Sequence, residues 1–363
     1  MREKKIITFL LPGHGAQPCG GYKVVYEYAN RLAADGCEVH IAYAGSLFWK
    51  KKSLYFKLTN VVRYLERWWK GYSCRRWFAL DKRVKEHWCY SLCEQHVPQA
   101  DIYVATSPYT AMYLKDYQID AKKFYFIQGY ENWGDVTDAR LRETYHYPLQ
   151  KIVVSTWLKQ IMDDEGLKCT QIPNGFDFSY FRKTKEPESR DACCISLCHH
   201  IAFAKGCDFA YAALNMVRSR FPELKVLIYS AYPAPRTLPD GCEYHRMPDR
   251  VLHNNINNTA AIFVAPSLDE GWGLTVGEAM MCGQAVVCTD NRGFREMAEH
   301  EVNALMVPVK DSQALADAII RLIEDDELRC RIARAGYASI QRFTWENSYA
   351  KLRELFGIER TTS

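Results

Sequence analysis

The first 45 residues alternate between β-rich apolar runs and a helical pattern. The run KIITFLL over Lys5–Leu11 ends at a Pro-Gly pair, and apolar residues between Val24 and Leu32 then recur at helical spacing. Gly36 ends this helix, and EVHIAYA over Glu38–Ala44 begins a second β-rich run. A strand, a helix and a second strand in this order form the β-α-β unit of a parallel sheet, so the chain begins as an α/β protein.

The same alternation continues in two halves. A length of 363 residues is long for one hydrophobic core, and residues 171–191 combine turn residues with a polar stretch, which places a domain junction there. We therefore predict two Rossmann-like, doubly wound α/β domains, 1–170 and 171–344, with an amphipathic helix at 345–358 packing back on the first. Further strands are expected at Asp101–Thr106, Lys123–Gln128, Lys151–Ser155, Cys194–Cys198, Lys225–Tyr229, Ala261–Ala265 and Ala285–Thr289.

The composition is that of a soluble globular enzyme. Apolar residues make up 48% of the chain and charged residues 25%, which excludes wholesale disorder. No apolar stretch approaches the roughly 20 residues that cross a bilayer, and no signal-peptide pattern opens the chain, so we expect a cytoplasmic location and reduced cysteines. A group of Cys and His residues lacks paired C-x-x-C spacing, so we expect core packing and no metal site at Cys193, Cys194, Cys198, His199 and His200.

The densest group of functional residue types reads PSLDEGWGLTVGEAMMCG over Pro266–Gly283. A strand that leads through a glycine-bracketed turn into a helix presents free backbone N–H groups and the positive end of the helix dipole, which suit a diphosphate. Gly271 and Gly273 allow the backbone to approach such a ligand closely. Glu270 lies on the loop and Glu278 about one turn inside the helix, so both carboxylates can face one site.

This stretch resembles the E-x7-E signature of family 4 of the retaining glycosyltransferases, also called glycosyl transferases group 1. The resemblance implies the GT-B fold, in which two Rossmann-like domains face each other across a cleft, and a nucleoside-diphosphate sugar as co-substrate. It places Glu270 beside the transferred sugar and Glu278 on the ribose hydroxyls of the nucleotide. The backbone that would hold the diphosphate falls on Gly271, Trp272, Gly273, Leu274 and Thr275, with Trp272 standing where the family has Phe.

The segment AKGCD over Ala204–Asp208 resembles the family's Lys-Gly-x-Asp, whose lysine neutralises the donor diphosphate. That role falls on Lys205. The family's preceding arginine is replaced by His199 and His200, which leaves the leaving-group charge to Lys205, a protonated His200 and the helix dipole. We expect these groups to suffice without a metal ion or another cofactor. Residues 291–296 lie where the family has a glycine turn followed by a glutamate.

The first half has its own glycine-rich loop, PGHGAQPCGG over Pro12–Gly21. The dinucleotide fingerprint fails here, because Pro18 stands at its third glycine and no acidic residue ends the second strand, so a nicotinamide enzyme is disfavoured. The resemblance instead implies the family's Gly-Gly loop, with Gly20 and Gly21 meeting donor phosphate or acceptor. His14 is a further candidate for the acceptor site.

The strand ending near Ile127 is followed by QGYENW over Gln128–Trp133. Many relatives carry a histidine here near the reacting sugar, and Gln128 stands in its place. Glutamine is no base at neutral pH, but it can hydrogen-bond a sugar hydroxyl or the departing oxygen. Glu131 is the nearest titratable residue and a candidate for the acceptor site, the alternative being that both residues are ordinary polar residues at a strand end.

A basic segment at 47–92 is rich in aromatic residues. Between Leu47 and Trp88 there are twelve Lys or Arg and three acidic residues, a local charge of +9. Two interpretations remain open: a solvated helical pair that packs its aromatics internally, and a surface that binds an anionic membrane or a lipid-linked acceptor. Nucleic acid is disfavoured because no nucleic-acid motif accompanies these residues.

These observations predict a retaining glycosyltransferase that moves a sugar from a nucleoside-diphosphate sugar to a glycan or lipid-linked acceptor. Cell-surface polysaccharide assembly, on the inner face of the cell membrane, is the expected setting. Two alternatives remain: a sugar-nucleotide epimerase of the same fold, which would isomerise its donor without an acceptor, and a catalytically silent subunit that binds a nucleotide sugar without turnover.

Overall fold

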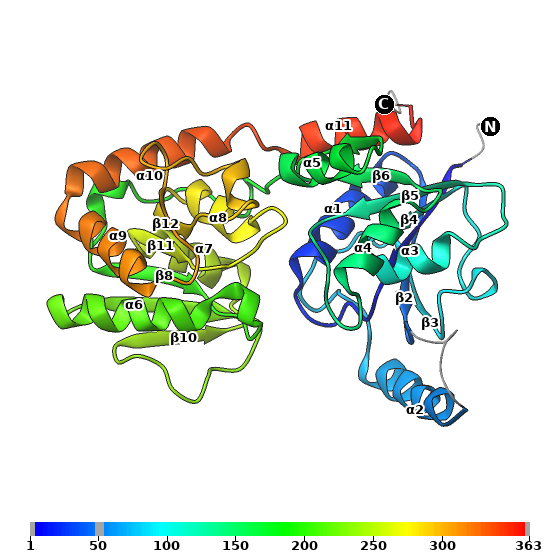
Figure 1. Cartoon of the computed structure of the whole chain (residues 1–363), viewed down its shortest axis with the longest axis horizontal. Coiled ribbons are helices and arrows are strands. Elements are labelled where there is room, and N and C mark those ends of the chain that lie inside the picture. The colour runs from blue at the N-terminus through cyan, green and yellow to red at the C-terminus, as the bar shows by residue number, and fades with distance from the viewer. Residues whose placement is uncertain (1–3, 48–53, 360–363) are drawn as a thin grey trace. The chain divides into compact units, whose positions relative to one another are not determined.

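The computed structural model describes residues 4–47 and 54–359, which divide into two compact units (Figure 1). The first unit contains the described residues up to Asn174 together with those from Trp345 onward. The second unit runs from Gly175 to Thr344. Each unit is built around one parallel sheet.

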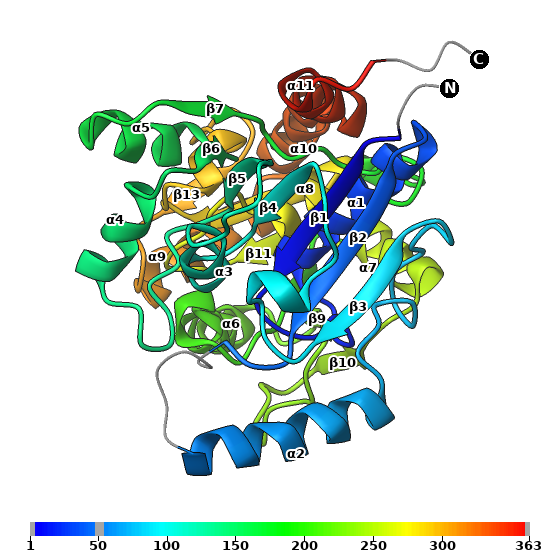
Figure 2. The same cartoon turned by 90° about the vertical axis from the view of Figure 1, so that its right-hand side faces the viewer.

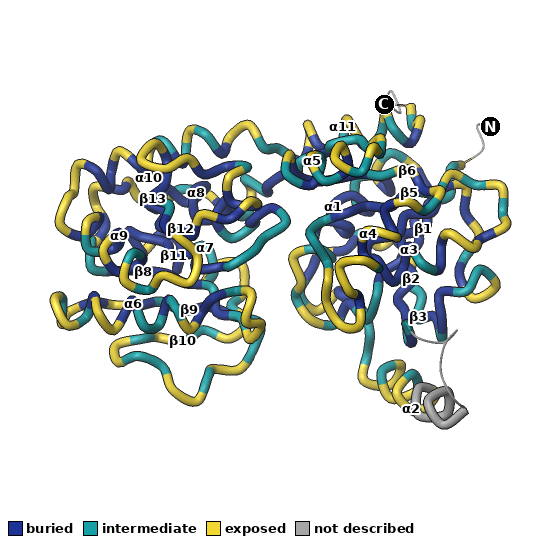
Figure 3. Tube along the Cα trace, in the orientation of Figure 1, coloured by how far each residue is buried: buried dark blue, intermediate teal, exposed yellow. Residues whose placement is uncertain are grey.

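The first unit has a seven-stranded sheet of order β3-β2-β1-β4-β5-β6-β7. Every neighbouring pair is parallel, so helices connect the strands and cover both faces. The central strands are almost entirely buried, which matches their continuous apolar runs (Figure 3). The strands are β1 (Ile6–Leu11), β2 (Glu38–Ala44), β3 (Lys85–Cys89), β4 (Ile102–Ala105), β5 (Lys122–Ile127), β6 (Gln150–Val153) and β7 (Cys169–Gln171).

The last helix of the chain, α11 (Trp345–Phe356), belongs to the first unit. The ring of Trp345 meets that of Tyr28 at 5.4 Å between centroids, and the hydroxyl of Tyr349 donates to Asp35 at 2.7 Å. Both partners belong to α1 or its C-terminal cap. The other helices of this unit are α1 (Gly20–Ala34), α2 (Leu54–Lys70), α3 (Pro108–Leu114), α4 (Asp138–Tyr145) and α5 (Thr156–Asp164).

The second unit has a six-stranded sheet of order β10-β9-β8-β11-β12-β13, again parallel throughout. Its core joins these strands to α6 and α9 through buried Val, Leu, Ile and Ala side chains. The strands are β8 (Cys194–Cys198), β9 (Lys225–Ser230), β10 (Cys242–Arg246), β11 (Ile262–Ala265), β12 (Ala285–Thr289) and β13 (Leu305–Val307). The helices are α6 (Cys207–Arg220), α7 (Arg250–Thr259), α8 (Leu274–Met281), α9 (Ser312–Glu324) and α10 (Asp326–Ile340).

Both sheets reverse their strand order at one point, between β1 and β4 and between β8 and β11. In open parallel sheets, ligands bind beyond the carboxyl ends of the strands at this switch point. The glycine loop of residues 12–19 follows β1, and the two loops that carry Lys205 and Glu270 follow β8 and β11. The prediction of two Rossmann-like α/β sheets is therefore confirmed, and the sheets place the candidate residues where such folds bind ligands.

Candidate active site

The loop between β11 and α8 ends in an open helix N-terminus. Gly273 precedes the helix with φ +96°, and a Cβ there would lie 2.5 Å from the ring of Phe294, so only glycine fits. No side chain caps the helix and no acidic residue lies in its first turn. The first N–H groups, at Leu274 and Thr275, thus keep the positive end of the dipole available to an anion.

A second loop brings Lys205 to the same place. Lys205 ends the 3-10 turn Phe203–Lys205, and Gly206 follows with φ +64°, packed so closely on Pro266 that a Cβ would collide with its carbonyl oxygen. The N–H of Leu268 donates to the carbonyl of Ala204 at 2.7 Å. This backbone contact joins the loops that follow β8 and β11.

The joined loops place a cation on a carboxylate. Nζ of Lys205 donates to Oε1 of Glu270 at 2.6 Å, with side chains 35% and 15% exposed. Both residues were predicted at the donor site, and the structure brings them together.

Glu278 lies inside α8 and is buried. Gly277 beside it packs on Phe176, whose ring leaves no space for a Cβ. Burial, the Cys207 thiol and the carboxylates of Glu278 and Glu270 together raise the pKa of Cys198 to about 12. Both glutamates thus lie near Cys198, at the end of β8.

The turn after β12 packs against the backbone of Glu270. A Cβ on Gly293 would lie 2.7 Å from Cβ of Glu270 and would collide with its carbonyl oxygen. Asn291, which is buried, donates from Nδ2 to the carbonyl of Ser267 at 2.9 Å. This turn was predicted only as the counterpart of the family's glycine turn, and its contact with Glu270 was not predicted. The glycine at 293 was the available signal.

His200 corrects one expectation. Burial first, and the charge of Lys205 second, lower the pKa of His200 below its ordinary value, so the imidazole is neutral at pH 7 and not the protonated group that we expected. Its hydrogen bonds agree: Nδ1 accepts from the N–H of Ala202 at 3.0 Å, which leaves Nε2 to donate to the hydroxyl of Tyr232 at 3.1 Å. Positive charge beside Glu270 therefore comes from Lys205.

The first unit gathers a separate group of candidates. Helix α1 begins at Gly20, and neither a capping side chain nor a first-turn acid closes its N-terminus. A Cβ on Gly21 would lie 3.4 Å from Nε2 of Gln128, so the amide of Gln128 lies against the start of this helix. Gln128, which directly follows β5, therefore meets the start of α1 beside the glycine loop.

Glu131 is half-buried as a residue, yet its Oε2 atom is buried and has no hydrogen-bond partner. Burial raises the pKa of this carboxyl to about 8, so it carries a proton at pH 7. This carboxyl lies near Tyr22 of α1 and Tyr125 of β5. Burial is the largest cause that raises the pKa of these two hydroxyls, and the charge of Glu131 is a further cause. A protonated carboxyl can donate a hydrogen bond, which an ordinary surface glutamate cannot.

His14 lies on the same glycine loop, half-buried. Its Nδ1 accepts from the N–H of Ala16 at 3.3 Å. Burial first, and the charge of Arg67 second, lower the pKa of His14. Arg67 belongs to α2, so the basic segment reaches the candidate acceptor residues.

The basic segment contains both packed and exposed aromatic side chains. Residues 48–53, Trp49 among them, lie outside the described ranges. Tyr64 and Trp88 stack on each other with centroids 5.7 Å apart, as the internal-packing interpretation expected. Trp68 and Trp69 instead remain 63% and 84% exposed on α2, as a docking surface would require. Within the described residues, no helix combines the length and apolar character needed to cross a membrane.

Comparison with known proteins gives a family match in the second unit. The family model "Glycosyl transferases group 1" matches residues 192–325, which contain Lys205, Glu270 and Glu278. This match makes the second unit similar to glycosyl transferases of group 1. The match falls on the second unit, around the two joined loops and α8.

Curated relatives of this chain include the phosphatidyl-myo-inositol mannosyltransferase of Mycolicibacterium smegmatis, 26% identical over 60% of this chain and 59% of the relative. The D-inositol 3-phosphate glycosyltransferase of Saccharomonospora viridis is 31% identical over 28% of this chain and 24% of the relative. The chain thus spans less than two thirds of the length of these curated relatives.

Solved structures share the fold along the whole chain. Sucrose-phosphate synthase from Thermosynechococcus elongatus matches with a TM-score of 0.71 and 16% identity, covering 98% of both chains. Anabaena HepE in complex with UDP and glucose also gives 0.71 and 16%, covering 97% of this chain and 99% of its own. The fold is therefore GT-B, as the resemblance implied.

Proposed function

We propose that this protein is a retaining glycosyltransferase that uses a nucleoside-diphosphate sugar. The observation that carries the proposal is the Lys205–Glu270 ion pair beside the uncapped N-terminus of α8, with Glu278 buried inside that helix. A cation and free N–H groups suit a diphosphate, and a buried carboxylate accepts hydrogen bonds from two ribose hydroxyls. Retention at the anomeric carbon rests on the similarity to the retaining family.

The roles proposed for these residues follow from the charge that develops on the leaving diphosphate. As the sugar separates, negative charge grows on the diphosphate, and groups already aimed at it stabilise the transition state more than the ground state. Lys205 and the first N–H groups of α8 take this role. Neutral His200, whose ring is hydrogen-bonded to Ala202 and Tyr232, contributes no charge. We propose that these groups act without a metal ion.

The acceptor is assigned to the first unit. Gly20 and Gly21 present an uncapped helix start, Gln128 lies against it, and Glu131 holds a protonated carboxyl nearby. His14 adds a neutral imidazole on the same loop. Amide, imidazole and protonated carboxyl groups are suited to hydrogen bonds with hydroxyls, and a glycan or lipid-linked acceptor presents such groups.

The basic segment supports an acceptor at a membrane. Exposed apolar residues on α2 lie within a stretch of local charge +9, a combination that favours an anionic bilayer. The M. smegmatis relative is named for a phosphatidyl-inositol acceptor. We propose peripheral binding at the inner face of the cell membrane, in the assembly of a cell-surface polysaccharide.

Product analysis tests the proposal. The protein is incubated with UDP-glucose or GDP-mannose, with and without a cell-envelope lipid extract as acceptor. A glycosyltransferase releases nucleoside diphosphate and labels the extract with an α-linked sugar when the donor is α-linked. Isomerised nucleotide sugar without acceptor would indicate an epimerase, and binding without turnover would indicate a silent subunit.

A further inference from the structure

Helix α2 has two different faces in its described part. Val62, Leu65 and Trp69 are exposed and follow one another at spacings of three and four residues, which places them on one side of the helix. The inner side is held by Tyr64, whose hydroxyl donates to the carbonyl of Trp88 at 3.0 Å. The indole of Trp88 returns a hydrogen bond to the carbonyl of Tyr64 at 3.0 Å. Figures 1 and 2 show the helix projecting from its unit.

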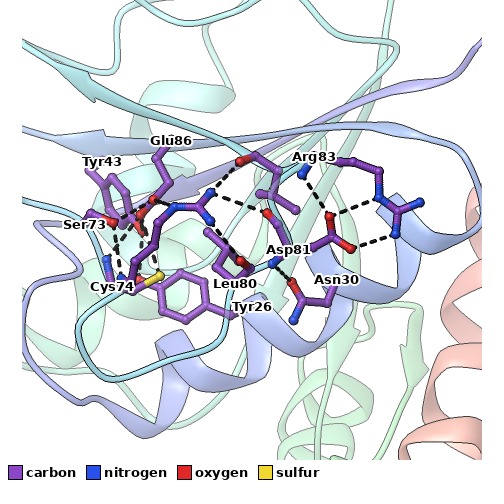
Figure 4. A network of polar contacts seen from close by, with 11 residues as sticks. Tyr26, Asn30, Tyr43, Ser73, Cys74, Leu80, Asp81, Arg83 and Glu86 are labelled. Carbon is purple, nitrogen blue, oxygen red and sulfur yellow. Dashed lines mark hydrogen bonds and ion pairs between the residues drawn. The ribbon is translucent and has the colours of Figure 1, made fainter.

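The loop that leaves α2 is fastened by one buried carboxylate. Glu86, on β3, accepts hydrogen bonds from Ser73 Oγ at 2.7 Å, from the N–H of Cys74 at 3.2 Å and from Arg75 Nε at 2.9 Å (Figure 4). Its side chain is 7% exposed, whereas that of Arg75 is 39% exposed, so the bonds from Ser73 and Cys74 are better sheltered from water than the bond from Arg75. The hydroxyl of Tyr43 donates to the same carboxylate at 2.9 Å.

The same loop grips the glycine loop of the candidate acceptor site. The N–H of Gly15 donates to the carbonyl of Tyr72 at 2.8 Å, and the carbonyl of Gly15 accepts from the indole Nε1 of Trp77 at 2.7 Å. A Cβ on Gly15 would lie 2.8 Å from the hydroxyl of Tyr43, and the hydroxyl of Tyr26 presses from the same side. Both backbone polar groups of Gly15 are therefore hydrogen-bonded, and the hydroxyls of Tyr43 and Tyr26 occupy the space that a side chain would need.

We propose that the loop of residues 71–77 couples α2 to the acceptor site, so that binding of an anionic bilayer by α2 sets the position of the His14–Gly15 loop. This inference rests on the membrane-bound acceptor proposed above. A bilayer can shift the glycine loop only if it binds one arrangement of α2 more tightly than others. The hydrogen bonds of Tyr72 and Trp77 to Gly15 would transmit that shift from α2 to the glycine loop. The His14–Gly15 loop would then become ordered when the protein is bound to the membrane that contains its acceptor.

Hydrogen exchange measures this coupling directly. The full chain is compared alone, with phosphatidylcholine vesicles, and with vesicles that also contain phosphatidylglycerol. With the anionic vesicles, exchange of backbone amides at 61–70 and at 12–19 should slow, the latter roughly tenfold, because an ordered loop opens less often. Neutral vesicles should leave both segments unchanged.

Two variants separate coupling from membrane binding. Trp77→Phe removes the bond to Gly15 but keeps an aromatic ring against Tyr26. It should still sediment with anionic vesicles and protect 61–70, while the slowing at 12–19 is lost. Trp345→Phe is the matched control, because the indole N–H that it deletes is buried without a hydrogen-bond partner. It should respond as the wild type does.

Ser73→Ala, which removes one bond to Glu86, serves as a second and milder disruption. It should reduce the slowing at 12–19 while vesicle binding persists. Vesicle binding without any slowing at 12–19 in the wild type, or equal slowing in Trp77→Phe, would overturn the coupling. Failure of the wild type to bind anionic vesicles would overturn it together with the membrane proposal, and would leave the donor site, which is tested by nucleotide binding, untouched.

Discussion

Nζ of Lys205 lies 2.6 Å from Oε1 of Glu270, so the residues assigned to the donor's phosphate and to its sugar form an ion pair with each other. A diphosphate that binds at α8 competes with Glu270 for this cation. Because the pair is only partly exposed, its attraction is less screened than that of a surface salt bridge. The pair therefore holds Lys205 at the place where, in the proposed reaction, charge would develop on the leaving diphosphate.

The first prediction concerns Lys205. Lys205→Ala should lower kcat by about 10²-fold, the effect of removing one preorganised charge-stabilising group, while the Kd of the donor changes less. Steady-state kinetics with the donor identified by binding provide the test. Lys225→Ala, an exposed lysine on β9 of the same unit, is the control and should keep the wild-type kcat. An unaltered kcat in Lys205→Ala would remove the residue from the mechanism.

The second prediction concerns the turn behind Glu270. Gly293→Ala forces a methyl group against the backbone of Glu270, so it should displace that carboxylate and cost about 1–3 kcal/mol of stability. Activity should fall together with the melting temperature. In Gly336→Ala, the matched control in α10, the new Cβ lies 3.2 Å from the side chain of Met280 and 3.3 Å from the carbonyl oxygen of Asn303, so it is crowded but meets no backbone atom as closely as at Gly293. If Gly293→Ala proves as stable and active as this control, the support of Glu270 by the turn is wrong.

Glu131 provides a pH prediction. Its pKa is about 8 in the folded protein against 4.5 for an ordinary carboxyl, so between these values the folded state keeps a proton that the unfolded state loses. Stability of the wild type should therefore fall as pH rises from 4.5 to 8 and then level off. Glu131→Gln does not titrate, so its melting temperature minus that of the wild type should rise across this window.

The control for this titration is Glu354→Gln, an exposed position on α11. Its melting temperature should follow the wild type at every pH. A difference between Glu131→Gln and the wild type that stays constant from pH 4.5 to 8 would show that the carboxyl of Glu131 titrates normally.

The fourth prediction concerns α2. Replacing both Trp68 and Trp69 by Ser should abolish cosedimentation with anionic vesicles, because their exposed rings provide most of the apolar contact. Wild-type binding should weaken as salt is raised, since the cations of the segment also contribute. Val251→Ser removes an exposed apolar side chain from α7 and should bind as the wild type does. Equal binding by the double variant would place the membrane contact elsewhere.

The fold could be predicted where strands are central. Lys5–Leu11 and Ala285–Thr289 are continuous apolar runs because both faces of a parallel sheet are covered, and the structure has strands there. The four edge strands, β3, β7, β10 and β13, were all missed. The sequences of β3 and β10, KEHWC and CEYHR, are half-exposed and carry charges, so they show no apolar run, and only pairing with β2 and β9 makes them strands.

The site could be predicted only in part. The glycine-bracketed E-x7-E pattern placed Glu270 and Glu278 on a loop and a helix, because that pattern is local in the chain. The contact of Gly293 with Glu270 depends on how two turns meet in space, and no local pattern encodes it. The neutral state of His200 likewise follows from burial and from the position of Lys205, which the residue types alone do not give.

Glu278 is proposed to hold the nucleotide of the sugar donor. Thermal unfolding of the wild type, of Glu278→Ala and of the exposed control Glu223→Ala is measured with saturating UDP-, GDP-, dTDP- and ADP-sugars. A ligand at a hundredfold excess over its Kd stabilises the folded state by about 2.7 kcal/mol. We predict stabilisation by one nucleotide class, retained in Glu223→Ala and lost in Glu278→Ala. Stabilisation by none of the donors, or equal stabilisation of Glu278→Ala, would contradict the assignment.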